Sequence, residues 1–163
     1  MALQPGFNCK LYRLSTGTRA SAGAASSGIV TAAAPANLNL VDQIENLKLD
    51  VESDAIEANI RSLAPYKTSI MGLIKVEVEF NFKFNTTADA DYQAFRGAFL
   101  TQANIACAIL TGASTTSGSE GWWADFIVTA FPREEEINGI VDVPVKLTLS
   151  SSTSVPPEYL VIS

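Results

Sequence analysis

The stretch that decides the fold is LIKVEVEFNFKFN, residues 73–85. Apolar and polar side chains alternate along it, and successive side chains of a β-strand point to opposite faces. The apolar series is Ile74, Val76, Val78, Phe80, Phe82 and Phe84, and the polar series is Lys75, Glu77, Glu79, Asn81 and Lys83. One face is therefore fully apolar, and a one-residue slip of the register would bury charges. At about 3.3 Å per residue this strand is about 40 Å long and requires long partners.

The rest of the chain adds further strands and one helix. The helix is predicted over residues 88–101, because Tyr92, Phe95, Phe99 and Leu100 recur at helical spacing. Its start would be capped by Thr86 or Thr87. Alternating patterns predict strands within residues 7–14, 104–111, 122–131 and 133–149, and a hairpin or a bent strand within 46–61. Residues 122–131 are apolar on both faces, which is typical of a strand buried between two layers. Pro144 places its own strand at an edge or at a bulge.

Three segments lack such patterns within what is otherwise a single domain spanning residues 1–163. Residues 15–37 are rich in Ala, Ser, Gly and Thr, which predicts a flexible loop that an outside partner orders. Residues 62–72 form an apolar loop, predicted to contact another subunit and to order on assembly. Residues 150–163 contain a Pro-Pro pair and predict an extended, mobile tail.

Composition argues against several functional classes. The net charge is −6 and the isoelectric point is about 4.6, which argues against binding nucleic acid through phosphate contacts, since that requires clustered Lys and Arg. The start of the sequence has neither a basic segment nor an apolar run, and no run reaches the length of a membrane span. We therefore expect a chain made in the cytoplasm, without a membrane anchor.

The sequence gives no catalytic, cofactor-binding or metal-binding candidates. It contains no His, the commonest general base and metal ligand. Asp89 and Asp91 resemble the start of a calcium loop, but the later ligands of that loop are missing, so the start of a helix is the better interpretation. Cys9 and Cys107 lie in apolar, strand-like contexts, which predicts small buried hydrophobic residues, with a disulfide as the alternative. We therefore expect no enzyme and no cofactor.

Several blocks resemble the phage major tail tube proteins of the long-tailed type. They are the opening GFNCKLYR, the long alternating strand followed by ADADYQAFRGAFL, the segment GWWADFIVTAFPREE, and VDVPVKLTL followed by PPEY. They cover most of the chain in the order of the family. The resemblance implies a mainly β fold, a β-sandwich or partly closed barrel with one flanking helix. It also implies hexameric rings stacked into the tail tube of a virion, which conducts DNA without binding it specifically. Its partners would be its own copies and the tape-measure, terminator and baseplate proteins.

Two groups of residues are candidates for roles in such a tube. The acidic region 42–57 suggests a negative lumen along which phosphates slide, with Asp50, Glu52, Asp54 and Glu57 as lumen candidates. The apolar loop supplies candidates for contacts between rings, namely Leu63, Tyr66, Ile70 and Met71. Two alternatives remain open: the inner tube of a contractile injection or gene-transfer particle, and a small β-sandwich that binds a ligand between its sheets.

Overall fold

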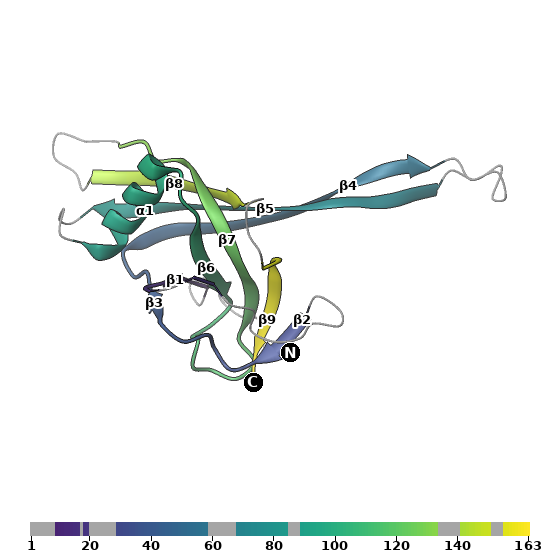
Figure 1. The fold of residues 1–163 in the computed structure, drawn as a ribbon, viewed down its shortest axis with the longest axis horizontal. Coiled ribbons are helices and arrows are strands. Elements are labelled where there is room, and N and C mark those ends of the chain that lie inside the picture. Colours follow the sequence, from purple (N-terminus) through teal and green to yellow (C-terminus); the bar gives the residue numbers. More distant parts are fainter. Residues whose placement is uncertain are drawn as a thin grey trace.

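The computed structural model describes residues 9–16, 18–19, 29–58, 68–84, 89–133, 141–150 and 155–163. These residues form nine strands and one helix (Figure 1). In chain order the elements are β1 (Lys10–Leu14), β2 (Ile29–Ala32), β3 (Leu38–Leu40), β4 (Ile44–Ala58), β5 (Thr68–Phe84), α1 (Ala90–Thr101), β6 (Ile105–Leu110), β7 (Glu120–Ala130), β8 (Val141–Leu149) and β9 (Glu158–Ile162). The prediction of a mainly β fold with one flanking helix is confirmed.

All nine strands belong to one open sheet in the order β3-β1-β6-β7-β8-β5-β4. The sheet forks at β7, because the second half of β7 pairs with β8 while its first four residues pair with β9. Beyond β9 lies β2, which runs parallel to it. Figure 1 shows the result: β8, β5 and β4 cross the top of the molecule, whereas β1, β3, β9 and β2 lie below, joined by β6 and β7.

Two apolar cores lie on the two faces of β6 and β7. The larger core is enclosed by β4, β5, β8 and α1 and contains Cys107 and Phe126. The smaller core is closed by β2 and β9 and contains Trp123 and Leu110. Neighbouring residues of β7, such as Trp123 and Ala124, therefore point into different cores, as expected for a strand with two apolar faces between layers.

The long strand β5 has 17 residues: it begins five residues before the predicted stretch of 73–85, at Thr68, and ends one residue earlier, at Phe84. Its apolar face is buried from Val76 to Phe82. The face packs on α1, with the rings of Phe80 and Phe95 5.4 Å apart and those of Phe82 and Tyr92 5.8 Å apart. The prediction fails at Ile74, whose side chain is 47% exposed because the core ends before it.

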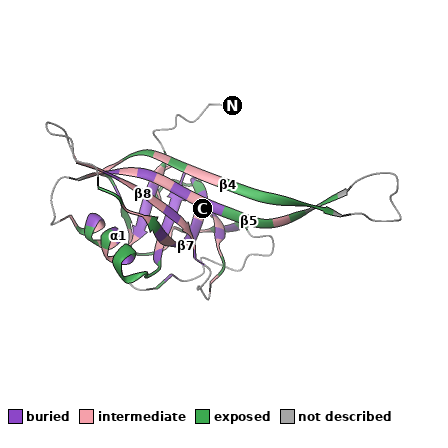
Figure 2. Cartoon of the chain, turned by 90° about the horizontal axis from the view of Figure 1, so that it is seen from above, coloured by how far each residue is buried: buried purple, intermediate pink, exposed green. Residues whose placement is uncertain are grey.

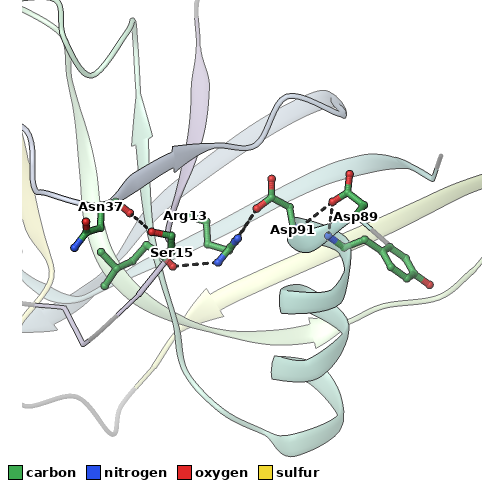
Figure 3. Close-up of polar contacts among 7 residues, drawn as sticks. Arg13, Ser15, Asn37, Asp89 and Asp91 are labelled. Carbon is green, nitrogen blue, oxygen red and sulfur yellow. Dashed lines mark hydrogen bonds and ion pairs between the residues drawn. The ribbon is translucent and has the colours of Figure 1, made fainter. Parts of the chain in front are cut away.

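The helix begins two residues later than predicted, and its cap is a different residue. Asp89 accepts hydrogen bonds from the backbone N–H groups of Asp91 and Tyr92, at 2.9 and 3.0 Å (Figure 3), whereas the predicted caps Thr86 and Thr87 lie outside the described residues. A carboxylate both accepts these bonds and complements the positive end of the helix dipole, which favours Asp over Thr here.

An ion pair then ties the start of the helix to β1. Arg13, which is almost fully buried, donates through Nε to Asp91 Oδ1 at 2.8 Å (Figure 3). The aromatic contacts hold one face of α1 against β5, and this pair holds its first turn against β1. The helix is therefore fixed to two different parts of the sheet.

Two segments predicted to be mobile contribute ordered structure within a single chain. Residues 29–32, inside the predicted loop 15–37, form β2, and residues 158–162, inside the predicted tail 150–163, form β9. The prediction of mobility is wrong for these parts, because each strand supplies a pairing partner for the other, which neither pattern reveals alone. Likewise β5 begins inside the predicted loop 62–72, at Thr68. Residues 20–28, 62–67 and 151–154 lie outside the described residues.

Arg19 connects the segment before β2 and the segment before β9 to the strand β7. Its side chain is fully buried and pairs with Asp125 at 3.0 Å between Nε and Oδ2. The guanidinium also donates to the carbonyl oxygens of Trp123, Val155 and Pro156 and lies 5.8 Å from the centre of the Trp123 ring. One cation thus connects the segment before β2, the strand β7 and the segment before β9.

The structure resolves the choice between a hairpin and a bent strand within residues 46–61, and it places Pro144 within its strand. Residues 46–61 contain a single long strand with an irregularity between Ser53 and Ala55, so the bent strand is correct and the hairpin is not. Pro144 lies in the part of β8 that pairs with β5 alone, since β7 reaches only as far as Lys146. Its missing N–H group is tolerated because the strand has a free edge there.

The two cysteines are both free, and only one of them is buried. Cys107 is buried as predicted, whereas Cys9 is exposed, because β1 begins only at Lys10. Burial raises the pKa of the Cys107 thiol to about 12. The thiol is therefore protonated in the folded chain throughout the ordinary pH range.

We expect a thiol reagent to label Cys9 at once and Cys107 only after unfolding. Because the pKa of Cys107 is higher in the folded chain than the ordinary value of about 8.5, its contribution to stability is complete below pH ~8.5 and is lost as the pH rises toward 12. The measurement is a count of labelled thiols by mass spectrometry at pH 8, with and without denaturant. Rapid labelling of two thiols in the native protein would contradict the buried position.

Replacing Arg19 by Met should lower the free energy of unfolding by about 3–5 kcal/mol, because Asp125 then keeps a charge without its main partner in a buried site. Denaturant titration measures this change. Lys75→Met is the matched control, since the pair between Lys75 and Glu77 is partly exposed, with Lys75 57% accessible, and its loss should cost far less stability than that of the Arg19 pair. Equal losses in the two variants would show that the Arg19 pair does not hold the terminal segments.

Candidate functional site

The most unusual feature of the molecule is a two-stranded arm formed by residues 51–58 of β4 and 68–75 of β5. The arm projects beyond the rest of the sheet (Figure 1), and most of its length is coloured as exposed (Figure 2). All the residues from 51 to 57 are exposed. The two strands pair with each other, from Glu52 opposite Lys75 to Ala58 opposite Thr68. At about 3.3 Å per residue the arm is about 25 Å long.

A β-bulge interrupts the arm at Gly72. Ser53 pairs with Ile74 and Ala55 with Met71, so Leu73 and Gly72 together oppose the single residue Asp54. A Cβ atom on Gly72 would lie 2.8 Å from the carbonyl oxygen of Asp54, closer than real Cβ atoms come. Glycine therefore lets the two backbones approach at this point. Such bulges increase the local twist of a hairpin and redirect it.

The arm exposes a concentration of large apolar side chains. Five residues of this kind lie on it, with exposed fractions between 45% and 90%: Val51, Ile56, Met71, Leu73 and Ile74. An isolated two-stranded hairpin is marginally stable in water, and contiguous exposed apolar side chains commonly mark a binding surface. The register places Val51, Ile74 and Met71 on the face that continues the buried face of β5. We call these three residues the apolar arm face.

The free edge of β4 adds to this surface. Among the described residues, β4 pairs with β5 alone and is the last strand of the sheet, so one edge of its 15 residues has no neighbouring strand. Long uncovered edges invite pairing with another chain. The arm therefore offers side chains on its faces and backbone groups along its edge.

The opposite face of β4, β5 and β8 is a ladder of ion pairs. Its described pairs include Lys75 with Glu77 at 2.8 Å, Lys146 with Glu79 at 3.1 Å, and Lys48 with Asp50 at 2.6 Å. Hydrogen bonds to Glu79 and Glu77 raise the pKa of Lys146, and the hydrogen bond from Lys75 lowers the pKa of Glu77. Lys146 and Glu77 are therefore charged at neutral pH, which makes this a highly polar face.

Three of the four lumen candidates share this polar face. Asp50, Glu52 and Asp54 alternate along β4 on the side of Glu77 and Lys75, their partners in the register. Glu57 lies on the other face of the arm, because it is an odd number of residues away from them along the same strand. Sequence reasoning grouped the four by charge alone and did not separate the two faces.

Of the candidates for contacts between rings, the structure describes part of the set. Met71 is 66% exposed and lies on the apolar arm face. Ile70 lies in β5 opposite Ile56. Leu63 and Tyr66 lie outside the described residues. Sequence reasoning missed Val51, Leu73 and Ile74, because their alternation looks the same whether or not a core lies beneath them.

An apolar groove of about 300 Å³ lies where the arm meets the rest of the sheet. Its lining comes from β4, β6, β7 and β9 and includes Leu49, Trp122 and Tyr159. Leu49 precedes Val51 by two residues on the same face of β4, so the groove is continuous with the apolar arm face. Its size is at the lower end for small-molecule pockets, and Glu120 is the one acidic residue in its lining.

Neither a metal site nor a membrane-spanning helix is found among the described residues. In that part of the chain no group of three or more His, Cys, Asp or Glu could hold a metal ion. Nor does any helix within the described ranges have the length and apolar character needed to cross a membrane.

Comparison with known proteins gives a consistent result for the fold. No family model and no curated protein matches the sequence. Among solved structures, the tail of an empty gene transfer agent particle with C6 symmetry matches with a TM-score of 0.63 and 11% identity over 94% of this chain and 99% of that one. The virion of a native gene transfer agent particle matches with a TM-score of 0.65 and 9% identity, over 96% of this chain and 98% of that one. The SPP1 tail tube matches with a TM-score of 0.64 and 12% identity, over 95% of this chain and 77% of that one.

These matches span almost the whole chain, so the expected tail-tube-like fold is confirmed. At this level of identity they establish the fold alone. The chain and the tail proteins share a fold, although few of their residues are the same.

Replacing Gly72 by Ala should loosen the arm without unfolding the core. The new Cβ atom would press on the backbone of Asp54, and the arm has no core beneath it to compensate. Amide hydrogens of residues 51–57 should exchange at least about tenfold faster, whereas those of β6 and β7 should keep their rates. Hydrogen exchange with mass spectrometry measures both.

Gly97→Ala is the control for that substitution. No atom lies within 4 Å of a Cβ placed on Gly97, and alanine favours a helix over glycine by about 1 kcal/mol. This variant should be slightly more stable, with unchanged exchange in the arm. Unchanged exchange in Gly72→Ala would refute the role of the bulge.

Proposed function

We propose that this chain is the subunit of a tail tube: a structural, non-enzymatic protein of a virion or gene-transfer particle that assembles with its own copies. The observation that carries the proposal is the arm, which exposes five large apolar side chains and a free strand edge in a chain with the tail-tube fold. Within one chain, none of the described residues covers these groups. A second copy supplies both an apolar surface and a strand to pair with.

The assembly is proposed to be head-to-tail. The arm extends from one end of the molecule, so a copy that receives it does so with a different part of its surface (Figure 1). Contacts between two different patches generate closed rings or continuing helical stacks. C6 symmetry is recorded for the gene transfer agent tail, and we propose hexameric rings for this chain by analogy.

The lumen of the tube is proposed to be lined by the polar face of β4, β5 and β8. Acidic residues outnumber lysines in that ladder, whose acids include Asp50, Glu52 and Asp54. A wall with excess negative charge repels phosphates and lets DNA pass without specific binding. Glu57, on the other face, does not belong to this wall. Tape-measure, terminator and baseplate proteins would be the partners at the ends of the tube.

Purified protein at high concentration should form rings or tubes visible by electron microscopy. The arm variant Ile74→Thr with Met71→Thr should keep its Tm, because both side chains are exposed, and should raise the concentration needed for assembly at least about tenfold, since two apolar side chains lose their burial. Threonine retains a high preference for strands, so the arm itself is preserved.

Ile29→Thr is the matched control for the arm variant. Ile29 is a similarly exposed isoleucine, at 53%, but lies on β2, away from the arm. This control should assemble like the original chain. A chain that stays strictly monomeric at high concentration would overturn the proposal and favour a binding module that uses the groove. A reconstruction with Asp50, Glu52 and Asp54 on the outside of the tube would refute the lumen assignment alone.

A further inference from the structure

A second exposed apolar surface lies on α1. Leu100 is 71% exposed and Phe99 is 37% exposed, and Arg96, also exposed, lies one turn before them. Residues three and four apart are neighbours on the surface of a helix, so the three side chains form one patch. We call Arg96, Phe99 and Leu100 the helix patch. The other side of α1, with Tyr92 and Phe95, is buried in the larger core.

The helix patch is rigidly presented. Asp89 caps the helix, Asp91 is bound by Arg13, and Phe95 packs on Phe80. At the other end, the ring of Phe99 stacks on Phe131 with 6.2 Å between centres. A surface that is already ordered loses little conformational freedom on binding, which favours affinity.

The helix patch and the arm lie at opposite ends of the molecule. Figure 1 and Figure 2 show α1 at one end and the arm at the other, in two views 90° apart. The strand β5 connects them, since its first residues belong to the arm and its last described part packs on α1. The two surfaces therefore cannot meet within one chain, but they can meet between two copies arranged head to tail.

The two surfaces are also complementary in chemistry. On the apolar arm face, Val51, Ile74 and Met71 lie on the same side as one acid, Glu57. The helix patch combines two apolar side chains with the cation Arg96. Opposite charges around an apolar contact favour correct orientation and suppress incorrect partners.

We propose that the helix patch of one copy is covered by the apolar arm face of the next copy. In each chain the apolar face of β5 already packs on a helix, through Phe80 and Phe95. The same face continues onto the arm as Ile74 and Met71, where no part of the described chain covers it. The helix α1 of a neighbouring copy covers this exposed part of the face. The proposal rests on the proposed function, since it specifies where the arm binds during self-assembly.

Disulfide trapping between two variants tests the contact directly. One chain carries Met71→Cys and the other Leu100→Cys, both with Cys9→Ser to remove the exposed native thiol; Cys107 is buried. Mixed and gently oxidised, they should give a covalent dimer. Ser117→Cys is the control partner for Met71→Cys, because Ser117 is exposed in the β6–β7 loop, away from α1. That mixture should give none.

A second variant measures the contribution of the contact. Leu100→Ser should leave the Tm unchanged, because the side chain is 71% exposed, and should raise the concentration needed for assembly about tenfold. Gln102→Ser, just beyond the end of the helix, is the control and should have no such effect.

The outcomes separate the two proposals. In one outcome, the original chain assembles and the arm variant does not, but Leu100→Ser assembles normally and no mixed disulfide forms. The helix patch is then not the acceptor of the arm, and the tail tube proposal stands. If the original chain remains monomeric and no mixed disulfide forms, both proposals fail. A mixed disulfide together with impaired assembly of Leu100→Ser establishes the contact.

Discussion

The structure depends on the pairing of β5 with a core that is shorter than the strand. β5 alternates apolar and polar residues from Ile74 to Phe84, but its apolar face is buried only from Val76 onward. In the buried half, that face packs on α1 through aromatic rings and so fixes the helix, the larger core and the position of β6 and β7. Toward the start of the strand the bulge at Gly72 interrupts the pattern, and no described residue buries Ile74 or Met71. A single strand thus both organises the core and extends beyond it as an exposed surface.

Much of this fold is predictable from local patterns. The alternation in β5, the two apolar faces of β7 and the helical spacing of Tyr92 and Phe95 each reflect a geometric rule with a short period. These patterns predict the type of each element and its buried side. They do not reveal where the core ends, because Ile74 and Val76 occupy equivalent positions in the pattern and differ only in what lies beneath them. The pattern therefore predicts that Ile74, which lies on the arm, belongs to the core.

The contacts that escaped prediction join segments far apart in the sequence. Arg19 lies in a segment of low complexity, and its partners are Asp125 on β7 and carbonyl groups near residue 155. No local pattern links these positions. The same holds for β2, four residues that form a strand because β9 offers an edge to them. The acids of β4 were recognised by charge, but their division between two faces depends on the register of the strand. For the candidate site, the sequence therefore reveals which residue types are present, and the structure shows which face of the strand each of them occupies.

The parallel pair of β2 and β9 has a consequence for the order in which the chain folds during synthesis. β2 lies early in the chain and pairs with β9, so it cannot join the sheet until the ribosome has made residue 162. The arm, by contrast, is a local hairpin that can form as soon as β5 has emerged. Both strands of the arm have therefore been made before the smaller core can receive β9, its last strand. Completion of the smaller core is a late event, separated in time from the synthesis of the arm.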